Sequence, residues 1–213
     1  RETQAILPLR GKILNVVSAS REKIRDNQEI QDLILAMGCG IGSSFSLKNL
    51  RYERVIIMTD ADVDGAHIAS LLMTFFYTQM PDMVANGHLY LAQPPLYRLT
   101  AGNVSAYAMN DAHKDELLKT TFKGKSKVDI SRFKGLGEMP AKQLKETTMA
   151  PESRTLIRVT LETAQLAADM VAGKAASKDP VLDDLVEKLM GKNAEARFDF
   201  IQQNATFVDN IDV

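Results

Sequence analysis

The chain has few of the residues that support disulfide, redox or membrane functions. It contains one cysteine, Cys39, and no tryptophan in 213 residues. A single cysteine cannot form a disulfide within the chain, which fits a reducing compartment. No apolar run approaches the roughly 18 residues of a membrane span, and the first residues resemble neither a signal nor a transit peptide. We therefore expect a globular, soluble, cytoplasmic protein without a membrane partner.

Positive charge is missing from the middle of the chain. Residues 55–97 include no Lys or Arg, although the whole chain has 26 of them against 27 Asp and Glu. Residues 1–25 carry six Lys or Arg against two Glu, and residues 119–134 carry six against one Asp. Basic flanks around an acidic centre suit a protein that grips a phosphate backbone, although two solvated basic faces would give the same pattern.

The acidic centre follows a short apolar run at residues 55–59, and its carboxylates alternate as Asp60, Asp62 and Asp64 before Gly65. A β-branched run before a helical pattern predicts a buried parallel strand and the first half of a βα unit. Open α/β sheets bind ligands outside the carboxyl ends of their strands, where residues i and i+2 point to the same side. We therefore expect Asp60 and Asp62 to converge on one site.

Close carboxylates repel one another unless a cation neutralises them, and no nearby side chain supplies positive charge. Oxygen ligands without a thiol or imidazole cluster suit Mg²⁺ better than zinc. The pattern predicts a Mg²⁺ site at Asp60 and Asp62, where Mn²⁺ or Ca²⁺ could substitute for binding. Asp64 is expected in outer or alternate metal binding.

The acidic motif admits three other interpretations. An EF-hand loop would need Glu at its twelfth position, where this chain has Leu71, so that interpretation fails. A strand that ends in Asp-x-Asp also occurs in phosphatases, with Asp60 as nucleophile and Asp62 as acid, and a phosphotransferase therefore remains open. A purely structural role in capping the next helix fits Asp64 better than the other two carboxylates.

The remaining patterns predict an α/β layer followed by helices. The helix after Gly65 has apolar residues at helical spacing and ends at Pro81, with His67 on another face, where it could contact a phosphate or stay solvated. Arg10 and Lys12 flank Gly11 in a basic turn that could contact phosphate.

The polar residues 111–127 are interpreted as a domain boundary. Further helices are predicted at 21–37, 142–147, 161–171, 181–190 and 194–203, and strands after residue 12 and at 88–92, 96–99, 107–109 and 130–132.

Five motifs occur in an order that resembles one family. They are Pro-Leu-Arg-Gly-Lys-Ile-Leu-Asn-Val at 8–16, Gly-Cys-Gly-Ile-Gly at 38–42, the acidic motif at 60–65, Gln-Pro-Pro-Leu-Tyr at 93–97 and Phe-Lys-Gly-Leu-Gly-Glu-Met at 133–139. Together they resemble the B subunit of bacterial type IIA topoisomerases over nearly the whole chain. The resemblance implies a Toprim domain at 1–110, a connection at 111–127 and a mostly helical B-subunit tail domain at 128–213.

The resemblance also implies a mechanism and partners. Asp60 and Asp62 would act in catalysis by holding Mg²⁺ beside the scissile phosphate of duplex DNA, while a tyrosine of the A subunit attacks. The two kinds of subunit would form an A₂B₂ heterotetramer on the nucleoid. By resemblance Lys12, Asn15 and His67 contact DNA, and the further expected contacts are Arg10, Lys134 and Arg197.

Two departures from the family pattern limit this expectation. The family's Glu-Gly-Asp-Ser-Ala-Gly-Gly motif on the first Toprim strand and its ATP-binding domain are absent from this chain, which we expect to be an inactive fragment when isolated.

Two features favour the topoisomerase IV branch over gyrase. They are the short connection between Leu99 and Arg132, and Lys145 at the position where gyrase B typically has Trp. A non-catalytic DNA-binding module is an alternative from a different class, beside the phosphotransferase.

Overall fold

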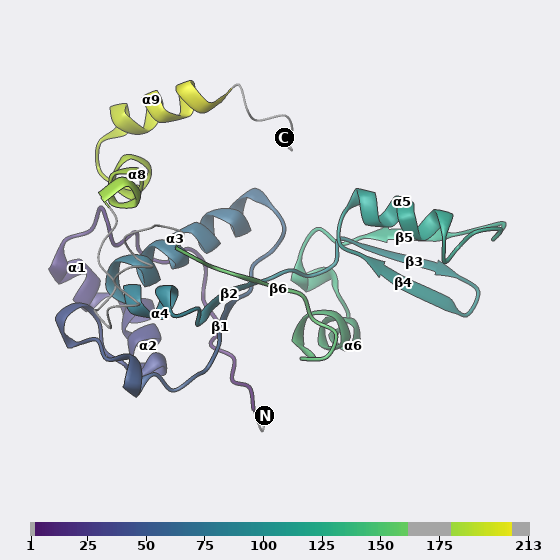
Figure 1. Ribbon diagram of the computed structural model, residues 1–213, viewed down its shortest axis with the longest axis horizontal. Helices are drawn as coiled ribbons and strands as arrows, with labels where there is room; N and C mark the ends of the chain where they lie inside the picture. Colours follow the sequence, from purple (N-terminus) through teal and green to yellow (C-terminus); the bar gives the residue numbers. More distant parts are fainter. Residues whose placement is uncertain (1–2, 162–179, 206–213) are drawn as a thin grey trace. The chain divides into compact units, whose positions relative to one another are not determined.

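The computed structural model describes residues 3–161 and 180–205 of the chain (Figure 1). The described residues fall into two compact units. Unit 1 comprises the described parts of Arg1–Glu53, Ser70–His88 and Thr160–Val213, and unit 2 comprises Arg54–Ala69 and Leu89–Val159. The α/β class expected from the sequence is confirmed. The helix predicted at 161–171 lies, apart from Leu161, outside the described residues.

Unit 1 is helical and is built around large apolar side chains. Its elements are α1 (Arg21–Asp26), α2 (Gln28–Met37), the later turns of α3 (Val63–Gln79), α4 (Pro81–Ala85), α8 (Pro180–Met190) and α9 (Ala194–Asn204). Phe75 and Phe76 of α3 are almost fully buried and meet edge to face, with ring centroids 5.2 Å apart. The Cys39 thiol lies 3.9 Å from Met80 Sδ, and burial raises the pKa of this thiol. Cys39 is therefore part of the core.

Two predictions for unit 1 are corrected by the structure. The single helix predicted at 21–37 is interrupted at Asn27, whose extended backbone ends α1 and whose side chain accepts a hydrogen bond from the Ile30 N–H at 3.0 Å, so that it caps α2. The short strand predicted directly after Lys12 does not form, and residues 13–20 contain no strand, because Asn15 Oδ1 accepts from the Val17 N–H and turns the chain. The predicted stop at Gly38 is confirmed, with φ +71°.

Unit 2 contains two three-stranded sheets. In the first, β1 (Val55–Ile57) pairs in parallel with β2 (Leu89–Ala92), as the βα pattern predicted, and Val55 lies opposite Leu89. The other edge of β2 pairs in antiparallel fashion with β6 (Leu156–Arg158). The strand β6 was not predicted from the sequence. The short α6 (Ala141–Leu144) and the π-helical turn Lys145–Met149 lie between the second sheet and β6 in the chain.

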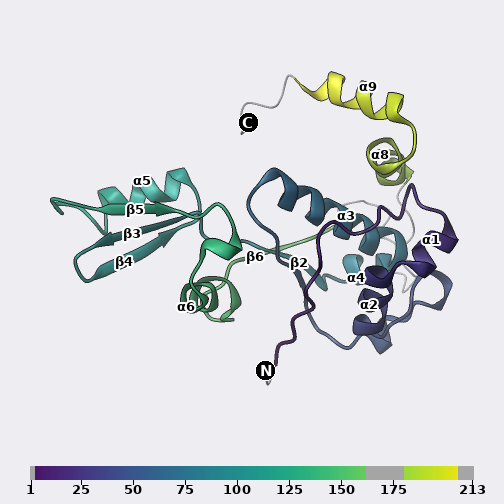
Figure 2. The ribbon, with the colours of Figure 1, turned by 180° about the vertical axis from the view of Figure 1, so that it is seen from behind.

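The second sheet has the order β4-β3-β5, and α5 (Asp111–Lys119) lies along one of its faces (Figures 1 and 2). The predicted hairpin is confirmed as β3 (Tyr97–Ala101) and β4 (Val104–Ala108), while β5 (Asp129–Arg132) pairs with the other edge of β3. Residues 111–127, expected as a connection, contain regular structure. These residues form α5 and a turn that buries Phe122 in the same core as Leu99, so the compact units do not separate there.

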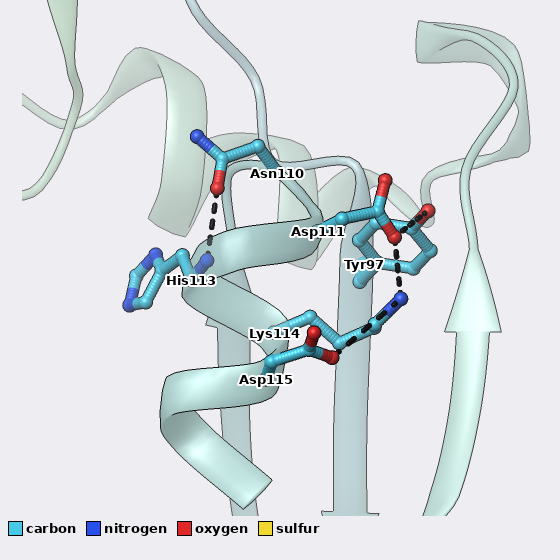
Figure 3. A network of polar contacts seen from close by, with 6 residues as sticks. All are labelled: Tyr97, Asn110, Asp111, His113, Lys114 and Asp115. Atoms are coloured by element: carbon cyan, nitrogen blue, oxygen red, sulfur yellow. Dashed lines mark hydrogen bonds and ion pairs between the residues drawn. The ribbon is translucent and has the colours of Figure 1, made fainter.

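A polar network anchors α5 to this sheet (Figure 3). The Asn110 side chain caps α5 by accepting from the His113 N–H at 2.9 Å. The buried Tyr97 donates its hydroxyl to Asp111 Oδ1 at 3.0 Å, and the Lys114 ammonium contacts the same oxygen and lies 4.7 Å from the centre of the Tyr97 ring. Hydrogen bonds from Lys114 and Tyr97 lower the pKa of Asp111, and the bond to Asp111 raises the pKa of Lys114.

The lowered pKa predicts how Asp111 contributes to stability as pH changes. Its contribution is present at pH values above its ordinary pKa of 3.8 and is lost as the pH falls through the lower pKa of the folded state. We expect Asp111→Asn to lower the free energy of unfolding at neutral pH, and the difference from wild type to shrink in acid. Urea unfolding at both pH values measures this. Asp115→Asn is the matched control, because its carboxylate lies 4.0 Å from Lys114, and an equal loss there would contradict the assignment.

Candidate metal site at the Asp60 turn

The site lies in unit 2, where the chain leaves β1 and enters α3. Asp60 and Asp62 follow the carboxyl end of β1, and both are exposed. The turn is tight because Gly65 packs against it: a Cβ at Gly65 would lie 2.1 Å from the Asp60 carbonyl oxygen. Any side chain at position 65 would therefore displace Asp60. The glycine of the acidic motif is needed for this close approach.

The Asp60 carboxylate contacts a segment far away in the sequence. Its Oδ1 accepts a hydrogen bond from the Leu136 N–H at 2.7 Å. Gly135 lies against the same group, and a Cβ there would be 2.8 Å from Asp60 Cγ. The donor is a backbone amide beside a glycine, so no charged or polar side chain indicates this contact. Sequence reasoning noticed the glycines but did not connect them with Asp60.

Residues 134–138, called the glycine turn below, are held in place at both ends. The Lys134 N–H donates to Glu138 Oε2 at 2.8 Å, and Leu136–Glu138 form one 3₁₀ turn. The flanking Phe133 and Met139 are buried. The Phe133 N–H also donates to the Leu96 carbonyl at 2.8 Å. The structure thus brings together three of the five sequence motifs, at 60–65, 93–97 and 133–139.

Asp62 has a second role as the cap of α3. Its Oδ1 accepts from the Gly65 N–H at 2.7 Å, and its carbonyl accepts from the Ala66 N–H at 3.0 Å. The capping role expected at Asp64 therefore falls on Asp62, because the helix begins at Val63. Asp64 lies in the first helical turn, where a carboxylate interacts favourably with the helix dipole.

The residues fit a cation that binds few protein ligands. A carboxylate offers about four lone-pair positions, and the hydrogen bonds described above use one on Asp60 and one on Asp62. Mg²⁺ is usually held by one or two carboxylates and keeps several waters. Among the described residues, no group of three or more His, Cys, Asp or Glu is arranged to hold a metal ion. The donor set therefore suits a hydrated divalent cation.

The other predicted contacts are divided between the units. His67 on α3 and Lys134 in the glycine turn are exposed in unit 2, together with the two carboxylates. Arg10 and Lys12 are exposed in unit 1, on either side of Gly11, whose φ of +135° favours glycine. The predicted set therefore does not fall within one compact unit.

Two predicted DNA contacts already have structural partners in unit 1. Asn15 donates from Nδ2 to the Met190 carbonyl at 2.8 Å. Arg197 donates from Nε to the Leu189 carbonyl at 2.7 Å and from Nη2 to the Gly191 carbonyl at 2.6 Å. These bonds satisfy carbonyls at the carboxyl end of α8, where a cation is favourable. The geometry gives Arg197 a structural role in joining α8 to α9.

Comparisons with known proteins agree with these features. Residues 1–94 match the model of the Toprim domain family, and residues 125–202 match the model described as DNA gyrase B subunit, carboxyl terminus. Toprim domains bind divalent metal ions. None of the helices in the described part of the chain is long and apolar enough to cross a membrane.

Curated relatives match the chain over nearly its full length. The B subunit of DNA topoisomerase 4 from Bartonella bacilliformis is 58% identical over 100% of this chain and 29% of the relative, and that from Caulobacter vibrioides is 60% identical over 97% and 28%. The B subunit of DNA gyrase from Halalkalibacterium halodurans is 49% identical over 100% and 31%. The chain thus spans about three tenths of the length of these relatives. The resemblance found in the sequence is confirmed, and the chain belongs to the family of bacterial type IIA topoisomerase B subunits.

Proposed function

We propose that this chain is the metal-binding and DNA-binding part of the B subunit of an ATP-dependent type II DNA topoisomerase. The observation that carries the proposal is the pair Asp60 and Asp62 at the carboxyl end of β1, within a Toprim match. Topoisomerase IV, which decatenates and relaxes DNA, is favoured over gyrase. Relatives named as topoisomerase 4 B subunits are 54–60% identical to the chain, and the gyrase B relative is 49% identical.

In this function Asp60 and Asp62 hold Mg²⁺, and Asp64 contributes through outer or alternate binding. The bound ion would stabilise charge on the scissile phosphate and on the leaving oxygen. The Leu136 amide orients the Asp60 carboxylate, and the backbone of Gly65 fixes the Asp62 carboxylate. Neither aspartate transfers a proton or forms a covalent bond in this role, which separates it from the phosphotransferase alternative.

The proposal assigns the remaining functions to partners. The attacking tyrosine belongs to an A subunit in an A₂B₂ assembly on duplex DNA, and ATP binds to a domain outside this chain. The protein works on the nucleoid in the cytoplasm. The Toprim domain comprises residues 1–110, the connection residues 111–127 and the tail domain residues 128–213. The interval between residues 94 and 125, which neither family model matches, supports a boundary in this part of the chain. The isolated chain should neither cleave DNA nor hydrolyse ATP.

Removing the charge of either aspartate tests the metal site. Asn at position 60 keeps an oxygen for the Leu136 amide, and Asn at position 62 remains a good helix cap, so both substitutions remove charge with little change in structure. We expect Asp60→Asn and Asp62→Asn each to weaken Mg²⁺ binding by at least about tenfold, a loss that even indirect metal partners produce. Isothermal titration measures the affinity.

DNA cleavage by the full-length protein reconstituted with its A subunit and Mg²⁺ provides the functional test. Cleavage should fall in both variants, whereas Asp64→Asn serves as the control with the smaller effect. Undiminished Mg²⁺ binding and DNA cleavage in a variant that combines Asp60→Asn with Asp62→Asn would refute the assignment of these residues to the metal site. An acid-stable, base-labile phosphoryl group on Asp60 would instead support the phosphotransferase.

Removing single or grouped lysine side chains tests DNA binding. Lys12→Ala should make the plot of log binding constant against log salt less steep by about 0.9, because one phosphate contact on duplex DNA is lost. Replacing Lys123, Lys125 and Lys127 together should reduce the slope further; these exposed residues lie in the loop between α5 and β5. DNA binding measured across a salt series gives the slope.

Arg197→Ala is the matched control for this experiment. It removes a cation without changing the slope, because its guanidinium is bonded to the end of α8. It should instead lower the free energy of unfolding by about 1.5–3 kcal/mol, the range for hydrogen bonds to charged groups. A reduced slope for Arg197→Ala with unchanged stability would restore it as a DNA contact, and an unchanged slope for Lys12→Ala would favour a solvated basic surface.

A further inference from the structure

We infer that the glycine turn positions the Asp60 carboxylate for the metal, so that the Toprim metal site is completed by a backbone amide from the tail part of the chain. Asp60 lies within the Toprim match at 1–94, and Leu136 lies within the carboxyl-terminal match at 125–202. The inference rests on the proposed function, in which Asp60 holds the ion. It adds a positioning group that is absent from the motif at 60–65.

The contact has the geometry of a charge-assisted hydrogen bond. The Leu136 nitrogen lies 2.7 Å from Asp60 Oδ1, at the short end of the range for an N–H that donates to a carboxylate. A Cβ at Gly135 would lie 2.8–3.0 Å from Cγ and from both oxygens of this carboxylate. The turn thus covers one side of the whole group. An exposed aspartate that would otherwise change rotamer freely is restricted to one orientation.

The turn is itself held in one conformation, so it can orient a partner. Glu138 accepts from the Lys134 N–H at 2.8 Å, and the Glu138 N–H donates to the Gly135 carbonyl at 3.2 Å. The buried Phe133 and Met139 anchor its two ends. Metal ligands commonly depend on such outer hydrogen bonds, whose loss typically costs 10–100-fold in metal affinity. The Leu136 amide is the donor of this kind for Asp60.

The backbone around Leu136 allows this single N–H to be removed. Leu136 is the first residue of a 3₁₀ turn, where the φ of proline is acceptable, and Gly135 is extended, with φ −159° and ψ 172°. Leu136→Pro therefore deletes the donor in a turn that tolerates proline. Leu136→Ala is the matched control, because it removes more of the side chain and keeps the N–H. Gly135→Ala is an independent variant, which pushes the carboxylate aside.

The experiment measures Mn²⁺ binding to the purified chain by electron paramagnetic resonance, with no requirement for activity. We expect Leu136→Pro and Gly135→Ala to weaken Mn²⁺ binding on the order of tenfold and Leu136→Ala to bind as wild type does. Melting temperatures in the absence of metal check that each variant is folded. Equal Mn²⁺ affinity in wild type and a folded Leu136→Pro would overturn the inference.

A metal-free measurement separates this inference from the proposed function. The Leu136 amide should be protected from hydrogen exchange in the wild type and should lose that protection in Asp60→Ala but not in Asp62→Ala. Protection that does not depend on Asp60 would overturn the inference whatever the metal data show. Asp60-dependent protection in a wild-type chain that binds no Mn²⁺ would support the contact, while it would overturn the metal role in the proposed function.

Discussion

Strand pairing between distant segments holds unit 2 together. β6 pairs with β2, and β5 pairs with β3, so each sheet takes one strand from the carboxyl-terminal family match. The first pairing is extended by hydrogen bonds from the Val159 N–H to Leu89 and from the Gln93 N–H to Thr155, at 2.9 and 3.0 Å. Backbone groups in a sheet need such partners, and the short strands β1 and β2 would make a weak sheet alone.

This pairing explains why the site combines motifs that are far apart. Once β5 is fixed beside β3, Phe133 bonds to Leu96 and the chain must turn immediately at residues 134–138. That turn meets the loop after β1, where Asp60 is located. The carboxylates are therefore oriented by sheet topology as well as by their own βα unit. Each family match covers one continuous stretch of sequence, whereas the folded units combine segments from both.

The sequence predicted what depends on local pattern. The βα unit, the two carboxylates at its strand end, and the helices near 181–190 and 194–203 follow from periodicity and composition, and the structure contains them. It did not reveal β6, because three residues without alternation give no strand signal. The helix α5 was not predicted either, because its polar sequence resembles a linker. In the structure Leu117 and Leu118 pack on the core. Tertiary packing decides the secondary structure of such segments.

The site illustrates the same limit at the level of atoms. Asp60 and Asp62 could be proposed from charge and spacing, but the Leu136 donor is a main-chain N–H that no residue type encodes. Asn15, by resemblance, and Arg197 are expected to contact DNA. Their bonds to the carbonyls of Met190, Leu189 and Gly191 depend on where α8 ends in space. The residue type gives the chemistry of a side chain. It does not show whether that side chain contacts a ligand or a main-chain group of the protein.

The separation between Asp60 and Leu136 has a consequence during synthesis. The two residues are 76 positions apart, so a nascent chain carries its acidic motif for many elongation steps before the partner amide exists. Local helices such as α3 form early, whereas contacts across long loops wait for the loop-closure entropy to be offset by packing. The carboxylate is therefore oriented only after the glycine turn has been synthesised. A truncated translation product that ends before the glycine turn carries both aspartates without the group that orients Asp60.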